Sequence, residues 1–399
     1  MSAQYARPLP SRRRLLIMLG ALSAFGPLSF DMYLPGLPQL TSDLGATDTG
    51  GQLSLSVSMI GLGLGQVVVG PLSDQVGRRW PLIIGVTLFT VAAVACALTP
   101  NLEFLLIARF LGGLGGGAGA VIARSMVRDL YSGREAARAF GITALVFGVA
   151  PVVAPLLGAL LLVVTGWRGI FVAIALCGAA LLVAAVRLPD TLPPEKRKDA
   201  KLWSLFSEFP RVLRDRSFLA PALVLAIGFQ PLSLYLAMSS FAMQNGYGLS
   251  AQQFGYLFAA NSVGILLLGR LNLRIVSIIG SFRVLVWTLA MSIVACLAVA
   301  VATHVEGASV WWVIIPLFFA ISVAGPLLPN ATTLALEGQG QAIGAAAACI
   351  GLVQSLFGAL IPPMVSLLGV TPQLMGMSMA IASVLCVVPL LAVPRAARL

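Results

Sequence analysis

Two residues of opposite charge lie inside long apolar runs of the sequence. Asp31 belongs to the run FGPLSFDMYLPGLP (25–38), and Arg109 begins the run RFLGGLGGGAGA (109–120). An ionised side chain at the centre of a membrane helix costs about 2.5 to 3.5 kcal/mol on insertion scales, so such residues usually serve a function. Burial disfavours the ionised form of a carboxyl group and a neighbouring arginine favours it, so a small change of geometry could bind or release a proton. A buried ion pair that only fixes one helix contact is the alternative interpretation.

The spacing of the two charges predicts that they lie at the same depth. Asp31 is seven residues before Pro38, the predicted outer end of its helix, and Arg109 is seven residues after Leu102. At 1.5 Å per residue each charge lies about 10 Å below the outer membrane boundary. We therefore expect Asp31 and Arg109 to form a proton-coupling site. We also expect the glycines after Arg109 to let its helix pack closely on the helix of Asp31.

The helices that position these charges must cross a membrane. Hydrophobic residues make up 59% of the 399 residues and charged residues 10%, against about 25% charged in a soluble domain. The apolar runs are continuous, which excludes the alternating pattern of a transmembrane β-barrel. The net charge of +11 comes from short basic clusters between these runs, so it does not predict nucleic-acid binding.

The sequence offers no group of residues for enzyme chemistry. His304 is the only histidine and falls in a predicted loop, and the five cysteines lie singly in apolar runs. Without a nucleophile–base pair or a metal-ligand cluster we expect neither an enzyme nor a metal or organic cofactor. Protons are the expected coupling ion.

We expect an all-α polytopic membrane protein with twelve transmembrane helices in two six-helix halves. One long polar segment, 189–216, separates an N-terminal half (1–188) from a C-terminal half (217–399). A duplicated arrangement of this kind is typical of transporters whose substrate site lies near the midplane between the halves. Part of the polar segment, 201–215, could form an amphipathic helix on the inner leaflet or remain a solvated linker. The predicted spans are 15–38, 50–73, 80–99, 103–128, 137–163, 167–188, 217–241, 251–278, 282–303, 309–330, 342–369 and 373–393.

Lysine and arginine fix the orientation of these spans. With twelve spans the basic clusters fall on one side of the membrane, and the opposite loops carry mainly acidic residues. By the positive-inside rule both termini are then cytoplasmic. An eleven-span arrangement would not place the clusters on one side. They lie at 12–14, 78–79, 134–138, 187–216, 270–283 and 395–398.

The loop between the second and third spans carries the most specific motif. Its sequence, GPLSDQVGRRWPL, contains Gly70, Asp74, Gly77, Arg78 and Arg79. This pattern resembles the G-x-L-x-D-x-x-G-R-R signature of the major facilitator superfamily, which implies the major facilitator fold. The resemblance also implies that Asp74 and the arginines latch the two halves together on the cytoplasmic side in the outward-open state. The equivalent stretch after span eight has basic residues but lacks the acid.

The fifth span resembles a motif of proton-coupled drug exporters. It carries Gly148, Pro151, Pro155 and Gly158, residues that kink a helix and permit close approach of its neighbours. Ala154 stands where the motif usually has the glycine before its proline. The same pattern also arises from ordinary transmembrane packing, so it favours export over import without deciding it.

Further segments are similar to the bicyclomycin/chloramphenicol-resistance (Bcr/CflA) family of drug–proton antiporters. They are DMYLPGLPQL, GQVVVGPLSDQVGRR, RSMVRDLYSGRE and LPDTLPPEKR. The resemblance implies proton-driven efflux of small antibiotics across a bacterial inner membrane by alternating access. Chloramphenicol and bicyclomycin-like compounds are the expected substrates. Export of an endogenous amino acid or sugar, with incidental drug resistance, is the alternative.

Neutral polar side chains of the second half are the candidate substrate contacts. They are Gln230, Tyr235, Asn261, Asn330 and Gln354. Hydrogen bonding between helices is the commoner role of a transmembrane Asn or Gln and is the alternative for each. A cavity with one carboxylate predicts small, mostly neutral substrates. We expect a monomer in the lipid bilayer that binds a small-molecule drug and no nucleic acid.

Overall fold

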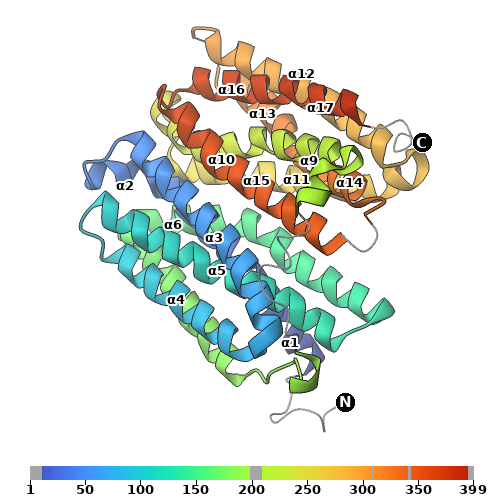
Figure 1. Cartoon of the computed structure of the whole chain (residues 1–399). Coiled ribbons are helices and arrows are strands. Elements are labelled where there is room, and N and C mark those ends of the chain that lie inside the picture. Colours follow the sequence, from blue (N-terminus) through green and yellow to red (C-terminus); the bar gives the residue numbers. More distant parts are fainter. Residues whose placement is uncertain (1–10, 198–208, 308, 340–342, 394–399) are drawn as a thin grey trace. The chain divides into compact units, whose positions relative to one another are not determined.

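The computed structural model describes residues 11–197, 209–307, 309–339 and 343–393, and every regular element in them is helical (Figure 1). Of the residues described, eleven helices are long and apolar enough to cross a membrane. One of them, α6, runs from Gly133 to Arg187 and contains two helices joined at Gly166, whose φ of 67° suits glycine. With α6 counted as two spans, these helices correspond to the twelve that the sequence predicts.

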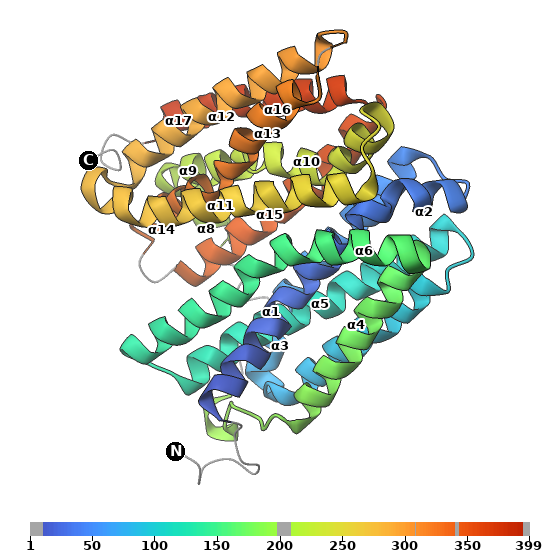
Figure 2. The same cartoon turned by 180° about the vertical axis from the view of Figure 1, so that it is seen from behind.

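The chain divides into two compact units. The first contains α1 to α6, except that residues 47–52 at the start of α3 group with the second unit. In the first unit α1 packs along α6 and α5, and α4 packs along α5 (Figure 2). Its elements are α1 (Arg12–Tyr33), η2 (Leu34–Gly36), α2 (Leu37–Asp43), α3 (Asp48–Val76), α4 (Arg79–Ala97), α5 (Leu102–Leu130), α6 (Gly133–Arg187) and η3 (Pro194–Lys196).

The first span is longer than the sequence predicts and is interrupted near its end. Helix α1 ends at Tyr33, a 3-10 turn covers Leu34–Gly36, and α2 continues to Asp43. Pro35 lies in the 3-10 turn and cannot donate a backbone hydrogen bond, which explains the interruption just after Asp31. The predicted end near Pro38 is therefore corrected to Asp43.

The second unit contains the elements from α8 onward. They are α8 (Phe209–Arg214), α9 (Arg216–Gly228), α10 (Gln230–Phe241), η4 (Ala242–Gly246), α11 (Ala251–Ile279), α12 (Ser281–His304), α13 (Trp311–Ser322), α14 (Ala324–Leu336), α15 (Ile343–Ser366), α16 (Pro372–Leu385) and α17 (Val387–Ala392). Three spans break in their interior, at Phe229, Val323 and Cys386. A proline follows each break within three residues and removes one backbone donor from the helix.

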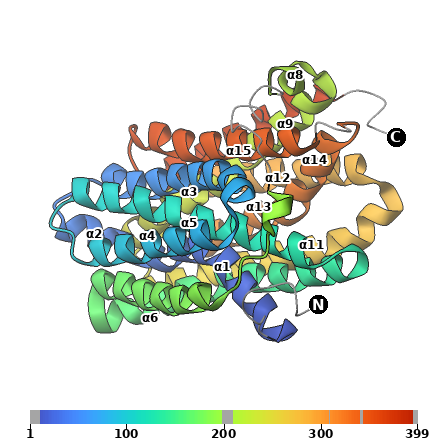
Figure 3. The same cartoon turned by 60° about the horizontal axis from the view of Figure 1, so that its bottom comes forward.

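The segment predicted to link the halves is described only in part. Its first residues form the turn Pro194–Lys196, and its last form α8, which lies beside the start of α9 (Figure 3). The predicted amphipathic helix 201–215 falls mainly outside the described residues.

Candidate functional site

Asp31 is a buried carboxylate on α1. Its side chain is 7% exposed. Across the part of the chain that the structure describes, it makes no ion pair. Helix α6 packs closely on α1 next to Asp31. A Cβ on Gly158 of α6 would overlap the carbonyl oxygen of Met32. The fifth-span glycine of the drug-exporter motif therefore packs on the turn that carries Asp31.

Arg109 is a buried cation held among aromatic rings. Its side chain is 6% exposed, and its guanidinium carbon lies 4.3 Å from the ring centre of Tyr33, 5.2 Å from that of Phe30 and 5.8 Å from that of Phe171. Its Nε and Nη2 atoms have no hydrogen-bond partner among the described residues. Desolvated cation–π contacts of this kind are worth about 2 kcal/mol. They partly replace the water that the guanidinium lacks.

The ion pair that equal depth suggested between Asp31 and Arg109 is not formed within the described chain. A residue on a helix is rotated by about 100° from the one before it. Phe30 and Tyr33 therefore share the face that meets Arg109, and Asp31 points away from that face. Equal depth alone does not bring two side chains together, and the described residues do not support the alternative interpretation of a structural ion pair.

Sequence reasoning also missed the aromatic residues around Arg109. Phe30 and Tyr33 are three positions apart, which is the spacing of neighbours on one helix face, so a signal was present. Tyr33 is fixed further by a hydrogen bond between its hydroxyl and Ser54 Oγ at 3.0 Å. Phe171 lies far along the chain on α6 and has no comparable local signal.

The glycines after Arg109 pack against three helices and not only against α1. A Cβ on Gly113 or Gly117 would overlap backbone oxygens of α3, and one on Gly115 would overlap a backbone oxygen of α4. Gly116 faces α1, where a Cβ would lie 3.0 Å from the Cα of Gly26. The expected contact with the first span is present, and the run also packs closely on α3 and α4.

The superfamily motif forms a charge network within the first unit. Arg78 Nη1 lies 2.5 Å from Asp74 Oδ1, and Arg78 Nε lies 2.9 Å from Asp129 Oδ2. Thr191 Oγ1 donates a second hydrogen bond to the same Asp129 oxygen. Burial alone would lower the pKa of Arg78, but the hydrogen bonds and charges of Asp129 and Asp74 outweigh it and raise that pKa. Arg78 is therefore a permanently charged centre.

The start of the predicted linker docks on the same loop. Arg78 donates its backbone N–H to Asp190 Oδ1 at 2.9 Å, and Arg197 contacts the other oxygen of Asp190 at 3.3 Å. Gly77 has a φ of 98° and no room for a side chain beside that carboxylate. Arg79 donates to the carbonyl of Val186 at 3.2 Å. Asp129 and Asp190 lie in two of the segments that resemble the family, and the sequence alone did not predict that they contact Arg78.

The other motif residues lie inside helices α3 and α6. Gly70 lies near the end of α3, where its carbonyl accepts a hydrogen bond from Ser73 Oγ at 2.7 Å. Gly148 is partly buried on α6, and Pro151 and Pro155 lie inside the same helix, where each lacks the donor of a helical hydrogen bond.

Three of the predicted substrate contacts bond to neighbouring helices of the second unit. Asn261 Nδ2 donates to the hydroxyl of Tyr235 at 3.0 Å, and Tyr235 stacks on Phe258 with ring centres 5.5 Å apart. Asn330 donates to Asn272 Oδ1 at 2.7 Å. These bonds favour the alternative interpretation, in which the residues join α10, α11 and α14 to one another.

The other two residues are less engaged. Gln230 Nε2 donates to the carbonyl of Ala226 at 2.8 Å, and its Oε1 has no partner in the described chain. Asn261 Oδ1 likewise has no hydrogen-bond partner in the described chain. Gln354 is partly exposed on α15. Gln230, Asn261 and Gln354 therefore retain atoms that a substrate could use.

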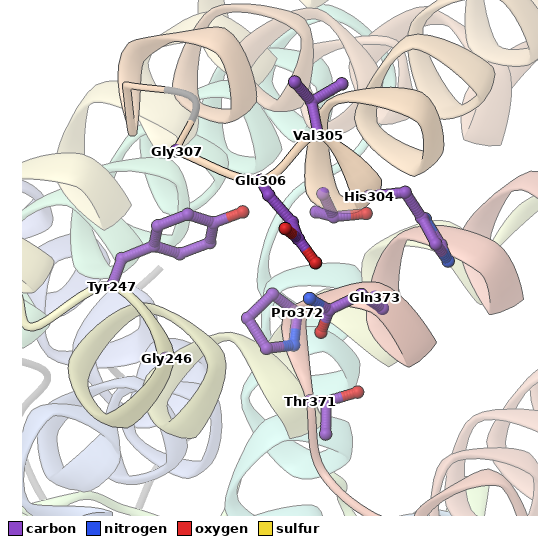
Figure 4. A pocket seen from close by; sticks show the side chains of 10 residues that line it. Gly246, Tyr247, His304, Val305, Glu306, Gly307, Thr371, Pro372 and Gln373 are labelled. Atoms are coloured by element: carbon purple, nitrogen blue, oxygen red, sulfur yellow. The ribbon is translucent and has the colours of Figure 1, made fainter.

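A cavity of about 330 Å³ lies among the loops of the second unit, and none of the predicted contacts lines it. Figure 4 shows the carboxylate of Glu306 pointing into this cavity, with Tyr247 and Pro372 at its sides. His304 belongs to its lining; it is the last residue of α12 and not a loop residue as predicted, and its Nδ1 lies 2.7 Å from the carbonyl oxygen of Ala300. The cavity is a feature of the loops and is separate from the buried charges.

Solved transporters share this fold. A bacterial homologue of the human lysosomal transporter Spinster, in an inward-facing unoccupied conformation, gives a TM-score of 0.70 at 16% identity and covers 96% of this chain and 95% of its own. A D-xylose–proton symporter gives a TM-score of 0.70 at 15% identity, with 93% and 96% covered.

Curated relatives match over most of their length. An uncharacterized MFS-type transporter, YdgK of Bacillus subtilis, is 36% identical over 94% of both chains. Multidrug resistance protein D of Escherichia coli is 28% identical over 94% of this chain and 95% of its own. A chloramphenicol resistance protein of Pseudomonas aeruginosa is 29% identical over 84% and 80%.

The family comparison agrees with the fold, the charge network and these relatives. Residues 17–362 match the Major Facilitator Superfamily. A bicyclomycin resistance protein homologue of Haemophilus influenzae is also 28% identical over 88% of both chains. The chain therefore belongs to the Major Facilitator Superfamily of membrane transporters, and its relatives place it with the bicyclomycin/chloramphenicol-resistance (Bcr/CflA) family.

Proposed function

We propose that this transporter exports small, mostly neutral antibiotics, such as chloramphenicol or bicyclomycin-like compounds, in exchange for protons. Relatives named for multidrug, bicyclomycin and chloramphenicol resistance support the efflux class. The observation that carries the proton coupling is the state of Asp31, which is buried and has no cationic partner in the described residues.

Asp31 is the proton carrier in this mechanism. An unpaired carboxylate loses the cost of a buried charge when it binds a proton, so its two forms favour different surroundings. The helix around it can respond, because Pro27 lies inside α1 and the 3-10 turn begins at Leu34, three residues after Asp31. A proton taken up from outside would thus favour one arrangement of α1, and its release inside would favour the other.

Arg109 supplies a fixed positive charge in the same unit. The three rings hold the guanidinium without neutralising it, since none of them carries a charge. A movement of α1 that brings this charge nearer to Asp31 would help the carboxyl group release its proton. A fixed buried cation disfavours the approach of cationic drugs, which supports neutral substrates.

The proposal includes the orientation of the chain in a bacterial inner membrane, with both termini cytoplasmic. It treats residues 1–188 and 217–399 as the two halves that alternate access, joined by 189–216. The Arg78 network then lies on the cytoplasmic side, where its acids and arginines are available to latch the halves in the outward-open state. The unit of transport is a monomer.

The decisive experiment measures chloramphenicol uptake into inverted vesicles energised by a pH gradient. We compare the native chain with Asp31→Asn and with Glu103→Gln, which removes an exposed carboxylate at the start of α5. Native and Glu103→Gln vesicles should accumulate the drug. Asp31→Asn should bind the drug and lose the accumulation that the gradient drives.

Two outcomes would contradict the proposal. If Asp31→Asn accumulates the drug as well as the native chain does, Asp31 is not the coupling group. If native vesicles accumulate no antibiotic but acidify or alkalinise on addition of an amino acid or sugar, the physiological cargo is a metabolite.

A further inference from the structure

A groove at the arginine-rich end of the first unit combines a basic rim with an apolar floor. It has a volume of about 540 Å³ and is lined by Arg12, Arg13, Leu16, Ile17, Arg138 and Ile142. We propose that this groove binds one anionic phospholipid of the inner leaflet, with the phosphate at the arginines and an acyl chain along the apolar residues. The proposal depends on the orientation proposed above but not on proton coupling or on the drug.

The register of both helices fits such a ligand. On α1, Leu16 and Ile17 follow Arg13 by three and four positions, and on α6, Ile142 follows Arg138 by four. Residues at these spacings share a helix face. The apolar side chains lie about one turn, or 5.4 Å, further into the membrane than the guanidinium groups. Each helix thus presents a charge at headgroup level above an apolar surface at acyl level.

The charges of the rim are not all neutralised by the protein. Arg12 is engaged, since its Nη1 lies 3.0 Å from Glu135 Oε1 and its guanidinium lies 5.2 Å from the ring centre of Tyr131. Arg13 and Arg138 are exposed and make no ion pair or hydrogen bond within the described chain. Two guanidinium groups therefore remain for an anion.

The floor distinguishes a lipid from a free anion. Ile17 is 48% exposed at a position where water is replaced by lipid or by a ligand, and an inorganic phosphate would gain nothing from it. Basic pockets between helices on the cytoplasmic side are suited to anionic headgroups, whose attraction adds about 1 kcal/mol per Lys or Arg near the surface. Residues 1–10 carry Arg7 and no acid, so their charge does not suit the groove.

The test is native mass spectrometry of the full chain in neutral detergent with phosphatidylglycerol or phosphatidylcholine of the same acyl chains. The native chain should bind phosphatidylglycerol in preference. Arg13→Gln with Arg138→Gln should weaken that binding by about tenfold or more, given the contribution of each surface arginine. Arg14→Gln with Arg134→Gln removes the same charge from exposed neighbours outside the groove and should weaken it much less. Ile17→Ser should also weaken it.

Thermal unfolding with and without phosphatidylglycerol gives a second readout that corrects for any loss of stability in the variants. Stabilisation by the lipid should disappear in the Arg13/Arg138 variant only. The proposal is overturned if the two lipids bind equally or if both double variants lose binding alike. It is also overturned if inorganic phosphate displaces the lipid while Ile17→Ser has no effect, or if deleting residues 2–10 creates binding that the full chain lacks.

Discussion

The two units of this transporter handle polar groups differently. In the described residues all four ion pairs lie in the first unit, and Asp31 and Arg109 lie in its helices. Helices α8 to α17 contain no Asp or Glu, and their buried polar contacts join neutral side chains such as Tyr235 with Asn261 and Asn330 with Asn272. The units share an all-helical architecture and differ in the charge that they bury.

This difference indicates a division of labour. Buried charges respond strongly to protonation and to the surrounding field, whereas neutral hydrogen bonds between membrane helices contribute about 0.6 kcal/mol on average and do not titrate. In the proposed mechanism the first unit would sense protons and the second would provide neutral contacts for the substrate. Four pairs of variants test this contrast, beginning with the largest expected effect.

Replacing Arg109 tests whether the first unit keeps a buried charge for function. Arg109→Met removes the charge and its two unpartnered nitrogens, so the unfolding midpoint should stay the same or rise, and proton-driven transport should fall to background. The control is Arg168→Met, which removes an exposed guanidinium 4.2 Å from the ring centre of Trp167. That change should cost about 0.5–1 kcal/mol and spare transport. Equal losses of stability and transport in Arg109→Met would show that the cation is structural.

Removing Arg78 should destabilise the first unit by about 2 to 3 kcal/mol. Arg78→Gln leaves Asp129 without its charged partner, although the partial exposure of Asp74 and Asp129, at 34% and 14%, reduces the cost below that of a fully buried pair. Arg79→Gln removes one hydrogen bond to a carbonyl and should cost far less. Thermal unfolding of the purified variants measures both. Similar unfolding midpoints for Arg78→Gln and Arg79→Gln would show that the ion pairs of Arg78 do not stabilise the first unit.

The contact between α1 and α6 can be probed at one glycine. Gly158→Ala forces a Cβ against the carbonyl of Met32 and should cost about 1 to 3 kcal/mol through overpacking. Gly141→Ala in the same helix meets open space and should be neutral or stabilising by up to about 1 kcal/mol. Unfolding midpoints and drug transport should both fall only in Gly158→Ala. If transport is unchanged in Gly158→Ala, the contact between the fifth-span motif and the turn of Asp31 is not needed for transport.

The smallest expected effect compares two tyrosines. Tyr235→Phe removes the hydrogen bond to Asn261, and Tyr33→Phe removes the one to Ser54, each at a cost of about 1 kcal/mol. Only Tyr33→Phe changes a contact of Arg109, so only this variant should alter transport. A raised KM for the drug in Tyr235→Phe, at unchanged stability, would instead make Tyr235 a substrate contact.

Much of the architecture could be read from local pattern. Continuous apolar runs predicted the membrane helices, and the glycine and arginine spacing at 70–79 predicted the superfamily, because both features depend on residues near one another in the chain. The sequence also predicted two spans within α6. Gly166 falls between two apolar runs that are each long enough to cross the membrane.

The partners of the buried residues could not be read in this way. Tyr235 was predicted to face a substrate and bonds to Asn261, and Asn330 bonds to Asn272, which no pattern had singled out. Asp190 lies 112 positions from Arg78 and still accepts its backbone N–H. Such partners depend on how helices pack, and packing joins positions whose separation in the sequence carries no signal.

The sequence by itself determined that this protein is a transporter with an acid, Asp31, and a base, Arg109, inside the apolar runs of its first half. It also predicted that the two charges lie at a similar depth, because the rise along a helix is the same for every residue. Only the tertiary structure decided which way each side chain points. The rotation of α1 is set by close contacts such as Met32 with Gly158 and Gly26 with Gly116. Those contacts turn Phe30 and Tyr33 toward Arg109 and leave Asp31 without a cationic partner in the described chain.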